Sequence, residues 1–201
     1  MAVYTLVEQD DLLEFLGAYD LGNVIAFKGI AEGVENSNFF LETDHGRYIL
    51  TLYEKRVDPA DLPFFIGLMD HLAAVGLPCP IPIRGNDGEP LRRLNDRPAA
   101  IISFLKGMSP QRPTVAHCSA LGHALAQFHK AGADFEIKRP NSLSVKGWRG
   151  LLDATTHRAD EVKPGLGEDL EAEYAELAAA WPQDLPQGVI HADMFPDNVF
   201  F

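Results

Sequence analysis

Basic side chains are scarce in this sequence. Its 201 residues include 17 lysines and arginines against 29 aspartates and glutamates, which gives a formal net charge of -12 at pH 7. Proteins that bind nucleic acids use clustered Lys and Arg to replace the counterions of the phosphate backbone. The charge balance therefore argues against a nucleic-acid partner, although it does not exclude a local basic patch for a small phosphate ligand.

Cysteine is also rare, with Cys79 and Cys118 as the two examples. Neither lies in a CxxC pair or near a suitably spaced histidine, which argues against a zinc site. Two alternatives remain, a single disulfide or two buried free thiols in a reducing compartment. We favour the buried thiols.

Long apolar runs are missing too. The longest, Ala99–Leu105, is interrupted by Ser103, whereas a membrane-spanning helix needs about 20 apolar residues. The N-terminal sequence MAVYTLVEQDD is acidic and lacks the layout of a signal peptide. Because 46% of the residues are hydrophobic, which is enough for a core, we expect a soluble, cytoplasmic protein with no membrane partner.

The first half of the chain alternates strand patterns with helix patterns. Apolar residues at helical spacing predict a helix over 8–19 and another over about 60–75, with Asp58 as N-cap and Pro59 at the first helical position. Stretches rich in β-formers, separated by short turns, predict an antiparallel sheet. These strands are expected at 23–30, 38–42, 47–53, 90–94 and 98–105.

The second half is mostly helical. Leu121, Leu125 and Phe128 form one stripe of a predicted helix over 114–131, and two more helices are predicted over 146–156 and 168–181. Short apolar segments at 188–191 and from Val199 onward are expected to be strands. The glycine and prolines of 106–113 suggest a hinge, so we divide the chain into a lobe 1–105 and a partial helical lobe 106–201.

The sharpest motif is HADMFPDN at 191–198. In phosphoryl transfer of the protein-kinase type, a loop Asp accepts or orients the proton of the attacking hydroxyl, and an Asn five residues later holds a magnesium ion. Asp193 and Asn198 have this spacing, and His191 would support the loop. The alternative is an ordinary Asp-Pro-Asn turn beside a buried histidine.

Weaker motifs lie in the first half. The stretch GIAEGVENSNFF at 29–40 has small residues at a hairpin turn, where backbone amides can approach phosphates, although most such turns are only turns. The strand YILTLYE at 48–54 has Thr51 where a kinase usually has Lys, and Lys55 lies beyond the expected slot.

Two other segments have structural and functional alternatives. On the helix LGHALAQFH, His129 is interpreted as a core histidine that ties the helix to the catalytic loop rather than as a catalytic group. The segment IISFL at 101–105 is either a buried strand or the inter-lobe strand whose backbone pairs with adenine.

Together these segments resemble the aminoglycoside phosphotransferase and choline kinase group, and within it the bacterial homoserine kinases. The similarity rests on EGVENSNFFLET, GRYILTLYE, GLPCPIPI and HADMFPDNVFF, which occur in the family's order. It covers almost the whole chain. The resemblance implies an α+β, protein-kinase-like fold with two lobes, a small antiparallel-sheet N-lobe and a mostly helical, truncated C-lobe.

The resemblance also implies a reaction, the transfer of the γ-phosphate of ATP to the side-chain hydroxyl of L-homoserine, with Mg²⁺ as cofactor, in threonine biosynthesis. By position, Asp193 is the catalytic base, His191 orients the loop and Asn198 is a metal ligand. The nucleotide would be bound by Gly33, Ser37, Asn38, Thr51, Ser103 and Leu105.

Two departures from the family pattern open alternatives. Thr51 replaces the usual cation, and the family's second metal-binding Asp would follow beyond Phe201. We therefore expect the 201 residues alone to be inactive, as a truncated form. The alternatives are a kinase for another small-molecule hydroxyl, or an inactive nucleotide-binding fragment. The sequence does not indicate the oligomeric state or the residues that grip the homoserine.

Overall fold

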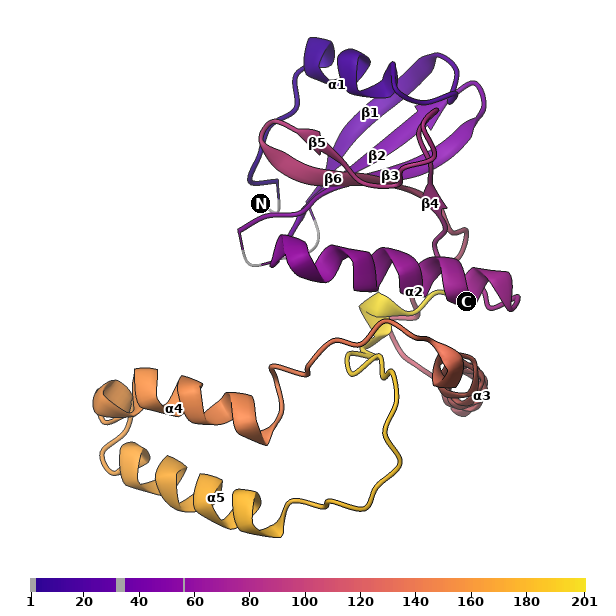
Figure 1. Ribbon diagram of the computed structural model, residues 1–201. Helices are drawn as coiled ribbons and strands as arrows, with labels where there is room; N and C mark the ends of the chain where they lie inside the picture. Colours follow the sequence, from indigo (N-terminus) through magenta and orange to yellow (C-terminus); the bar gives the residue numbers. More distant parts are fainter. Residues whose placement is uncertain (1–2, 32–34, 56) are drawn as a thin grey trace. The chain divides into compact units, whose positions relative to one another are not determined.

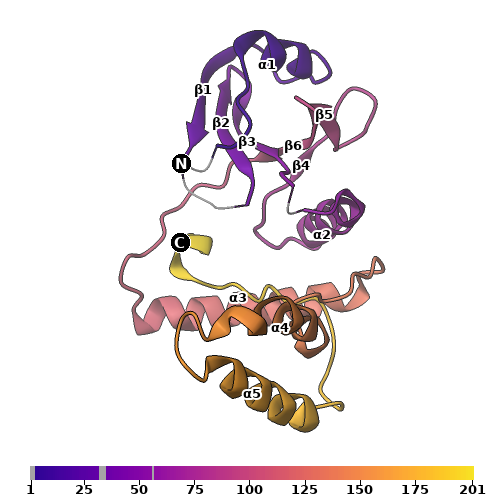
Figure 2. The same cartoon turned by 90° about the vertical axis from the view of Figure 1, so that its left-hand side faces the viewer.

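A computed structural model describes residues 3–31, 35–55 and 57–201. The chain forms two compact units. The first comprises 1–137 together with 188–201, and the second comprises 138–187. Each unit is drawn in Figures 1 and 2. The predicted division into lobes 1–105 and 106–201 remains a prediction.

The first unit is built on an antiparallel sheet in the order β1-β2-β3-β6-β4, with β5 paired to β6. The β2 strand shows strict alternation, with every second side chain buried, as expected where one sheet face meets a core. Five predicted strands are confirmed within a few residues. The bounds are β1 Val24–Ile30, β2 Ser37–Thr43, β3 Gly46–Leu52, β4 Pro82–Ile83, β5 Arg92–Leu94 and β6 Arg97–Ser103.

Helix α1, Gln9–Leu16, covers one face of this sheet (Figures 1 and 2). Its Leu12, Phe15 and Leu16 are buried against side chains of the strands, among them Leu41 and Leu50, which have no exposed surface. Burial of such side chains stabilises the fold by about 1.5–3 kcal/mol each. The predicted first helix is therefore confirmed, and its apolar positions define which sheet face is the core.

Helix α2, Leu62–Ala74, lies on the other side of the sheet from α1 (Figures 1 and 2). The chain enters it through the 3₁₀ turn Pro59–Asp61, where the Asp58 carboxylate accepts a hydrogen bond from the Ala60 amide. The predicted cap is correct, but the α-helix begins two residues later than expected. Gly76 ends it at φ 83°, a conformation that glycine adopts without strain.

Helix α3, Val115–Ala131, begins with a capping box in which Thr114 and His117 each accept from the other's backbone amide. The predicted stripe of Leu121, Leu125 and Phe128 is the less exposed side of this helix. Its C-terminal end is held to α2, because His71 Nε2 lies 2.7 Å from the Ala131 carbonyl oxygen. The predicted helix over 114–131 is confirmed.

The second unit is a helical hairpin of α4, Val145–Ala159, and α5, Leu166–Ala180. Both helices are close to their predicted bounds. Arg149 binds both carboxylate oxygens of Glu171 at 2.7 Å, and the rings of Trp148 and Trp181 meet edge to face with centroids 5.4 Å apart. These contacts hold the two helices side by side.

Several expectations about secondary structure and burial are wrong. The segments at 188–191 and 199–201 are extended but not strands, because the backbone pairing recorded there is a single bridge between Phe201 and Met108. Cys118 is exposed on α3 rather than buried, and Cys79 is half-buried; both are free. Burial, with a contribution from Asp70, raises the pKa of the Cys79 thiol.

The β4 strand was not predicted, because LPCPIPI contains three prolines. Pro82 pairs with Ile102 and Ile83 with Ile101 at the edge of the sheet, where a missing N–H is tolerated. Among the described helices, none has the length and apolar character needed to cross a bilayer.

A buried polar network fixes the start of β2. The Ser37 hydroxyl has no exposed surface, accepts from the amides of Tyr4 and Thr5, and donates to Glu54 Oε1 at 2.7 Å. The other carboxylate oxygen of Glu54 pairs with Arg97 at 3.0 Å. The network therefore joins the N-terminal segment to β2 and to the chain after β3.

We expect Ser37→Ala to lower the free energy of unfolding of the full-length protein by about 1–3 kcal/mol, because the buried Glu54 carboxylate loses its donor and the Tyr4 and Thr5 amides lose their acceptor. Chemical denaturation measures this change. Ser119→Ala, on the exposed surface of α3, is the matched control and should change stability little. An equal effect of the two substitutions would contradict a structural role for the network.

Candidate active site

The loop at 191–198 brings its two predicted functional side chains together. Asn198 Nδ2 donates to the backbone oxygen of Asp193 and to its Oδ2, both at 2.9 Å. A 3₁₀ turn at Pro196–Asn198 folds the chain back, with the Asn198 amide bonded to the Phe195 carbonyl at 2.9 Å. Both side chains are exposed, so the pair is open to a ligand.

The turn before Asp193 contains backbone strain. Ala192 has φ 64°, a region that non-glycine residues rarely occupy and that is concentrated at functional sites. His191 Nδ1 accepts from the Asp193 amide at 3.3 Å, so the histidine stabilises this tight turn. The Ala192 conformation was not predicted, and the sequence has no signal for it because alanine does not favour positive φ.

Phe128 rather than His129 connects α3 to the loop. The rings of Phe128 and His191 lie edge to face, with centroids 6.4 Å apart, whereas His129 is exposed. The interpretation of His129 as a core histidine is therefore wrong. It lies next to the apolar stripe of α3 but outside it, and Phe128 occupies the position that faces the loop.

The oxygen atoms that the loop offers as metal ligands fit a hard cation. Because Asn198 donates from Nδ2 to Asp193, its Oδ1 is turned away from that bond and is available as a ligand, and Mg²⁺ prefers oxygen ligands. The Asp193 carboxylate supplies further oxygens nearby. In the described part of the chain no three His, Cys, Asp or Glu side chains form a metal-binding group.

The C-terminal side of the loop is fixed against the segment after β6. Met108 and Phe201 exchange two backbone hydrogen bonds of 3.2 and 3.1 Å, and the Phe201 ring lies 4.7 Å from that of His117 on α3. Gly107 permits this approach. Its φ is 152°, and a Cβ there would lie 2.9 Å from the Phe200 Cβ.

We expect Gly107→Val to destabilise the full-length protein by about 1–3 kcal/mol, because the side chain would displace the 200–201 segment. Thermal or chemical denaturation measures the loss. Gly122→Ala on α3 is the control, since a Cβ there meets no heavy atom within 4 Å, and a gain of about 0.5–1 kcal/mol is expected from helix propensity. A Gly107→Val protein as stable as the parent would contradict the close approach.

Two of the predicted nucleotide-binding residues are partners in the sheet. Asn38 and Thr51 lie opposite each other on β2 and β3, and the Thr51 hydroxyl donates to Asn38 Oδ1 at 2.8 Å. Ser37 points to the opposite face, into the buried network described above. Gly33 lies outside the described residues.

The other two predicted nucleotide-binding residues, Ser103 and Leu105, lie at the end of β6. Ser103 exchanges hydrogen bonds with Ile81, its amide donating to the Ile81 carbonyl at 2.8 Å and its Oγ accepting from the Ile81 amide at 2.9 Å. The amide and the hydroxyl oxygen of Ser103 are thereby engaged, whereas Leu105 follows the strand and is 37% exposed. The Phe104 ring meets Phe40 of β2 edge to face at 5.7 Å, so the end of β6 and β2 share an aromatic contact.

With this geometry described, comparison with known proteins identifies the family. A sequence model of the phosphotransferase enzyme family matches residues 26–201. The chain belongs to this family. Among the relatives of this chain are a homoserine kinase of Rhodospirillum rubrum, 63% identical over 201 residues, and one of Bradyrhizobium diazoefficiens, 60% identical over 202 residues. Each match covers 100% of this chain but 63% and 62% of those proteins, so the chain spans somewhat less than two thirds of their length.

Solved structures confirm the fold of the chain. Spectinomycin phosphotransferase APH(9)-Ia, in complex with ADP and spectinomycin, superposes with a TM-score of 0.70 at 14% identity, over 98% of this chain and 66% of that one. The GDP and kanamycin complex of APH(2")-IIia gives 0.67 at 16% identity, over 96% and 67%. The expected α+β fold with an antiparallel-sheet N-lobe and a helical remainder is therefore correct.

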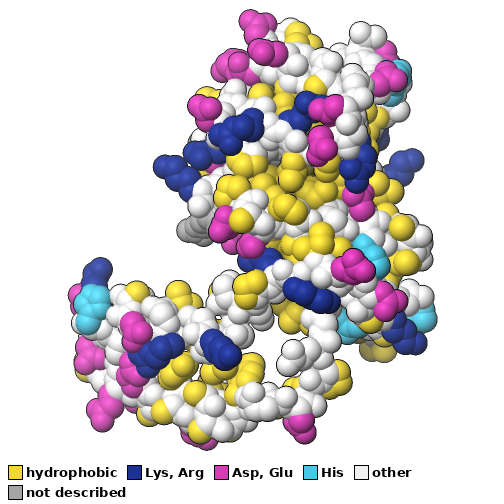
Figure 3. All heavy atoms as spheres, viewed as in Figure 1, with side chains coloured by type: hydrophobic (Ala, Val, Ile, Leu, Met, Phe, Trp, Pro, Cys, Tyr) yellow, Lys and Arg dark blue, Asp and Glu magenta, His cyan; other side chains and the backbone are white. Residues whose placement is uncertain are grey.

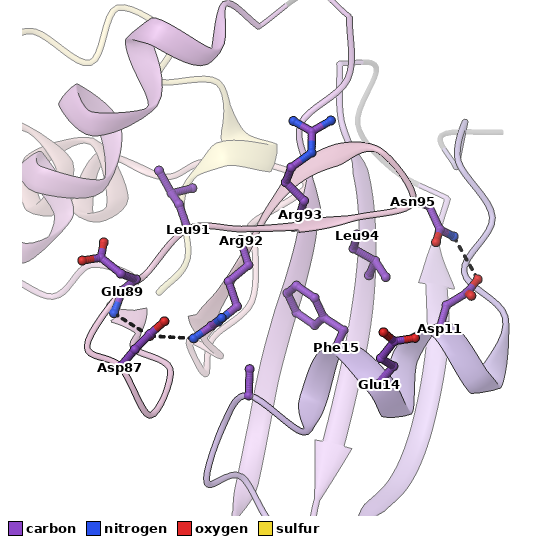
Figure 4. Close-up of a pocket in the computed structure, with 11 residues that line it drawn as sticks. Asp11, Glu14, Phe15, Asp87, Glu89, Leu91, Arg92, Arg93, Leu94 and Asn95 are labelled. Carbon is purple, nitrogen blue, oxygen red and sulfur yellow. Dashed lines mark hydrogen bonds and ion pairs between the residues drawn. The ribbon is translucent and has the colours of Figure 1, made fainter.

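A cavity of about 490 Å³ in the first unit lies apart from these residues (Figure 4). It opens between α1 and the segment before β6, on the α1 side of the sheet, and none of the predicted site residues lines it. Arg92 donates to Asp87 at 2.6 Å, and Asp11 accepts from Asn95 at 3.1 Å. Four of its polar side chains are thus bound to one another in pairs.

The surface of the first unit has charges of both signs. In Figure 3, acidic side chains gather at its top, and several basic side chains lie close together below them at its left edge. Several basic residues are paired, such as Arg47 with Glu42 at 2.8 Å.

Proposed function

We propose that the full-length protein is a homoserine kinase that uses ATP. The observation that carries the proposal is identity of 63% and 60% to two homoserine kinases over the whole of this chain. The Asp193–Asn198 pair supports it, because one loop then offers a proton acceptor and a metal ligand.

The proposed reaction follows from the loop. The side-chain hydroxyl of L-homoserine attacks the γ-phosphorus of ATP, the bond from that phosphorus to the β–γ bridging oxygen breaks, and ADP leaves. Asp193 accepts the hydroxyl proton. Asn198 holds Asp193 by its Nδ2 and offers Oδ1 to Mg²⁺, which when bound neutralises the charge on the phosphates.

The rest of the site is proposed from placement. His191 and the strained Ala192 orient Asp193. Leu105, free of the pairing that engages Ser103, is the better candidate for a backbone contact to adenine. Any contribution of Ser37 to the nucleotide would come from its backbone or through its neighbours, because its hydroxyl is buried. Gly33 remains a prediction, as does the cytoplasmic location.

A coupled assay of ADP release from the full-length protein, with ATP and Mg²⁺, tests the proposal. L-Homoserine should support turnover, whereas choline and an amino sugar should not. Turnover with one of the other alcohols but not with homoserine would reject the substrate and keep the phosphotransferase chemistry. The fold likeness to antibiotic phosphotransferases is the reason to include the amino sugar.

A further inference from the structure

The cation that a kinase usually carries on its third strand is absent here, and so is its acidic partner. In protein kinases a β3 Lys binds the α- and β-phosphates and pairs with a Glu on the following helix. This chain has Thr51 on β3, and α2 has one carboxylate, Asp70, which pairs with Arg84 instead. Both members of the ion pair are therefore replaced.

A neutral pair occupies the corresponding place. Thr51 is 8% exposed, and its hydroxyl donates to Asn38 Oδ1 at 2.8 Å across the β2–β3 ladder. Because an amide has one acceptor oxygen and one donor nitrogen, this bond fixes the orientation of the Asn38 side chain. Its Nδ2, with two N–H donors, is then directed away from Thr51.

Asn38 and Thr51 lie on the sheet face opposite the α1 core. Their neighbours on β2, Ser37 and Phe39, are buried toward the core side, as strand alternation requires. Phe40, two residues after Asn38 and on its face, contacts Phe104 at the end of β6. Asn38 is therefore on the face that leads to the segment proposed to contact adenine.

We propose that Asn38 anchors the nucleotide, with its Nδ2 donating to an α- or β-phosphate oxygen, and that Thr51 is the positioning residue that holds the amide in this orientation. The ligand is a nucleoside triphosphate, so the inference rests on the proposed kinase function. A neutral hydrogen-bonded pair thus takes the place of the Lys–Glu ion pair. Lys28 is the alternative phosphate-binding residue. Strand alternation places it on the same face of the sheet, where it pairs with Phe40 across the β1–β2 ladder.

The test uses the full-length protein and two near-isosteric changes. Asn38→Asp replaces the donor with a carboxylate and should raise the KM for ATP and the Kd for ADP by about tenfold or more, since 1.4 kcal/mol corresponds to a factor of ten. Thr51→Val removes the hydroxyl and should raise the KM for ATP and the Kd for ADP severalfold. Thr51→Ser keeps the hydroxyl and should leave both constants close to those of the parent. The KM for homoserine should stay unchanged.

Coupling between the residues separates positioning from direct contact. If Thr51 acts through Asn38, the double variant should bind ADP no worse than Asn38→Asp alone. Additive effects would overturn the role of Thr51, and an unchanged Kd for ADP in Asn38→Asp would overturn the anchor. Weaker ADP binding in Lys28→Met, with Asn38→Asp unaffected, would move the anchor to β1.

Two controls make the outcome specific. Asn86→Asp, in an exposed turn, should leave the Kd for ADP unchanged, and denaturation without nucleotide checks that each variant is folded. ADP binding by calorimetry does not depend on the acceptor alcohol. Failure to phosphorylate homoserine would therefore reject the proposed substrate while the anchor is still tested.

Discussion

Asp193→Asn in the full-length protein is expected to lower kcat by about 10³-fold, within the range of 10²–10⁴ typical for a positioned general base. The substitution removes the proton acceptor and preserves the shape of the side chain. Since Asp193 acts on the acceptor hydroxyl, the affinity for ADP should change little. A coupled assay and calorimetric titration with ADP measure the two quantities.

Asp197→Asn is the matched control, because it removes an exposed carboxylate four residues later in the same loop. It should retain most of the activity. If Asp193→Asn retained most of its rate as well, Asp193 would not be the base. If both variants lost activity equally, the effect would reflect the charge of the loop rather than proton transfer.

Asn198→Ala should lower kcat by about 10²–10³-fold, the size of loss seen when one preorganised electrostatic contact is removed. Two functions are lost together. The Asp193 carboxylate loses the donor 2.9 Å away, and the metal loses an oxygen ligand. The Mg²⁺ concentration needed for half-maximal rate should therefore rise, which a titration of rate against Mg²⁺ measures.

Asn198→Asp separates the two functions. It keeps an oxygen ligand but replaces the donor to Asp193 with a second carboxylate, so it should bind the metal and still turn over slowly. Asn86→Ala, in an exposed turn, is the control outside the loop. An unchanged Mg²⁺ requirement in Asn198→Ala would exclude Asn198 as a ligand.

Most elements of the fold could be predicted from local patterns. The strands of the meander, the capped start of the helix after Asp58 and the stripe of α3 all follow from residue spacing and turn chemistry. The β4 strand could not be predicted, because its short, proline-rich segment becomes a strand through pairing with Ile101 and Ile102. The strands predicted at 188–191 and from Val199 onward were wrong for the reverse reason. Their apolar pattern is typical of a strand, but a segment becomes one only when it pairs with a neighbouring strand.

The proximity of Asp193 and Asn198 was predictable because they are five residues apart in one loop; their catalytic roles stay a prediction. The role of Ser37 was harder to predict. Its hydroxyl is turned toward the core by strand parity and is engaged by Tyr4, Thr5 and Glu54, which are distant in sequence. Similarly, the rotation of α3 about its axis decides that Phe128, and not His129, contacts the segment 188–201.

The sequence by itself determined the order of the elements, the placement of Asp193 and Asn198 in one short loop, and the absence of a β3 lysine. These depend on residue type and on neighbours a few positions away. Tertiary structure alone decided that the Asn198 amide faces Asp193, that Ala192 adopts a left-handed conformation, and that Thr51 bonds to Asn38. Such contacts depend on side-chain direction and on ladders between strands, which no local pattern contains.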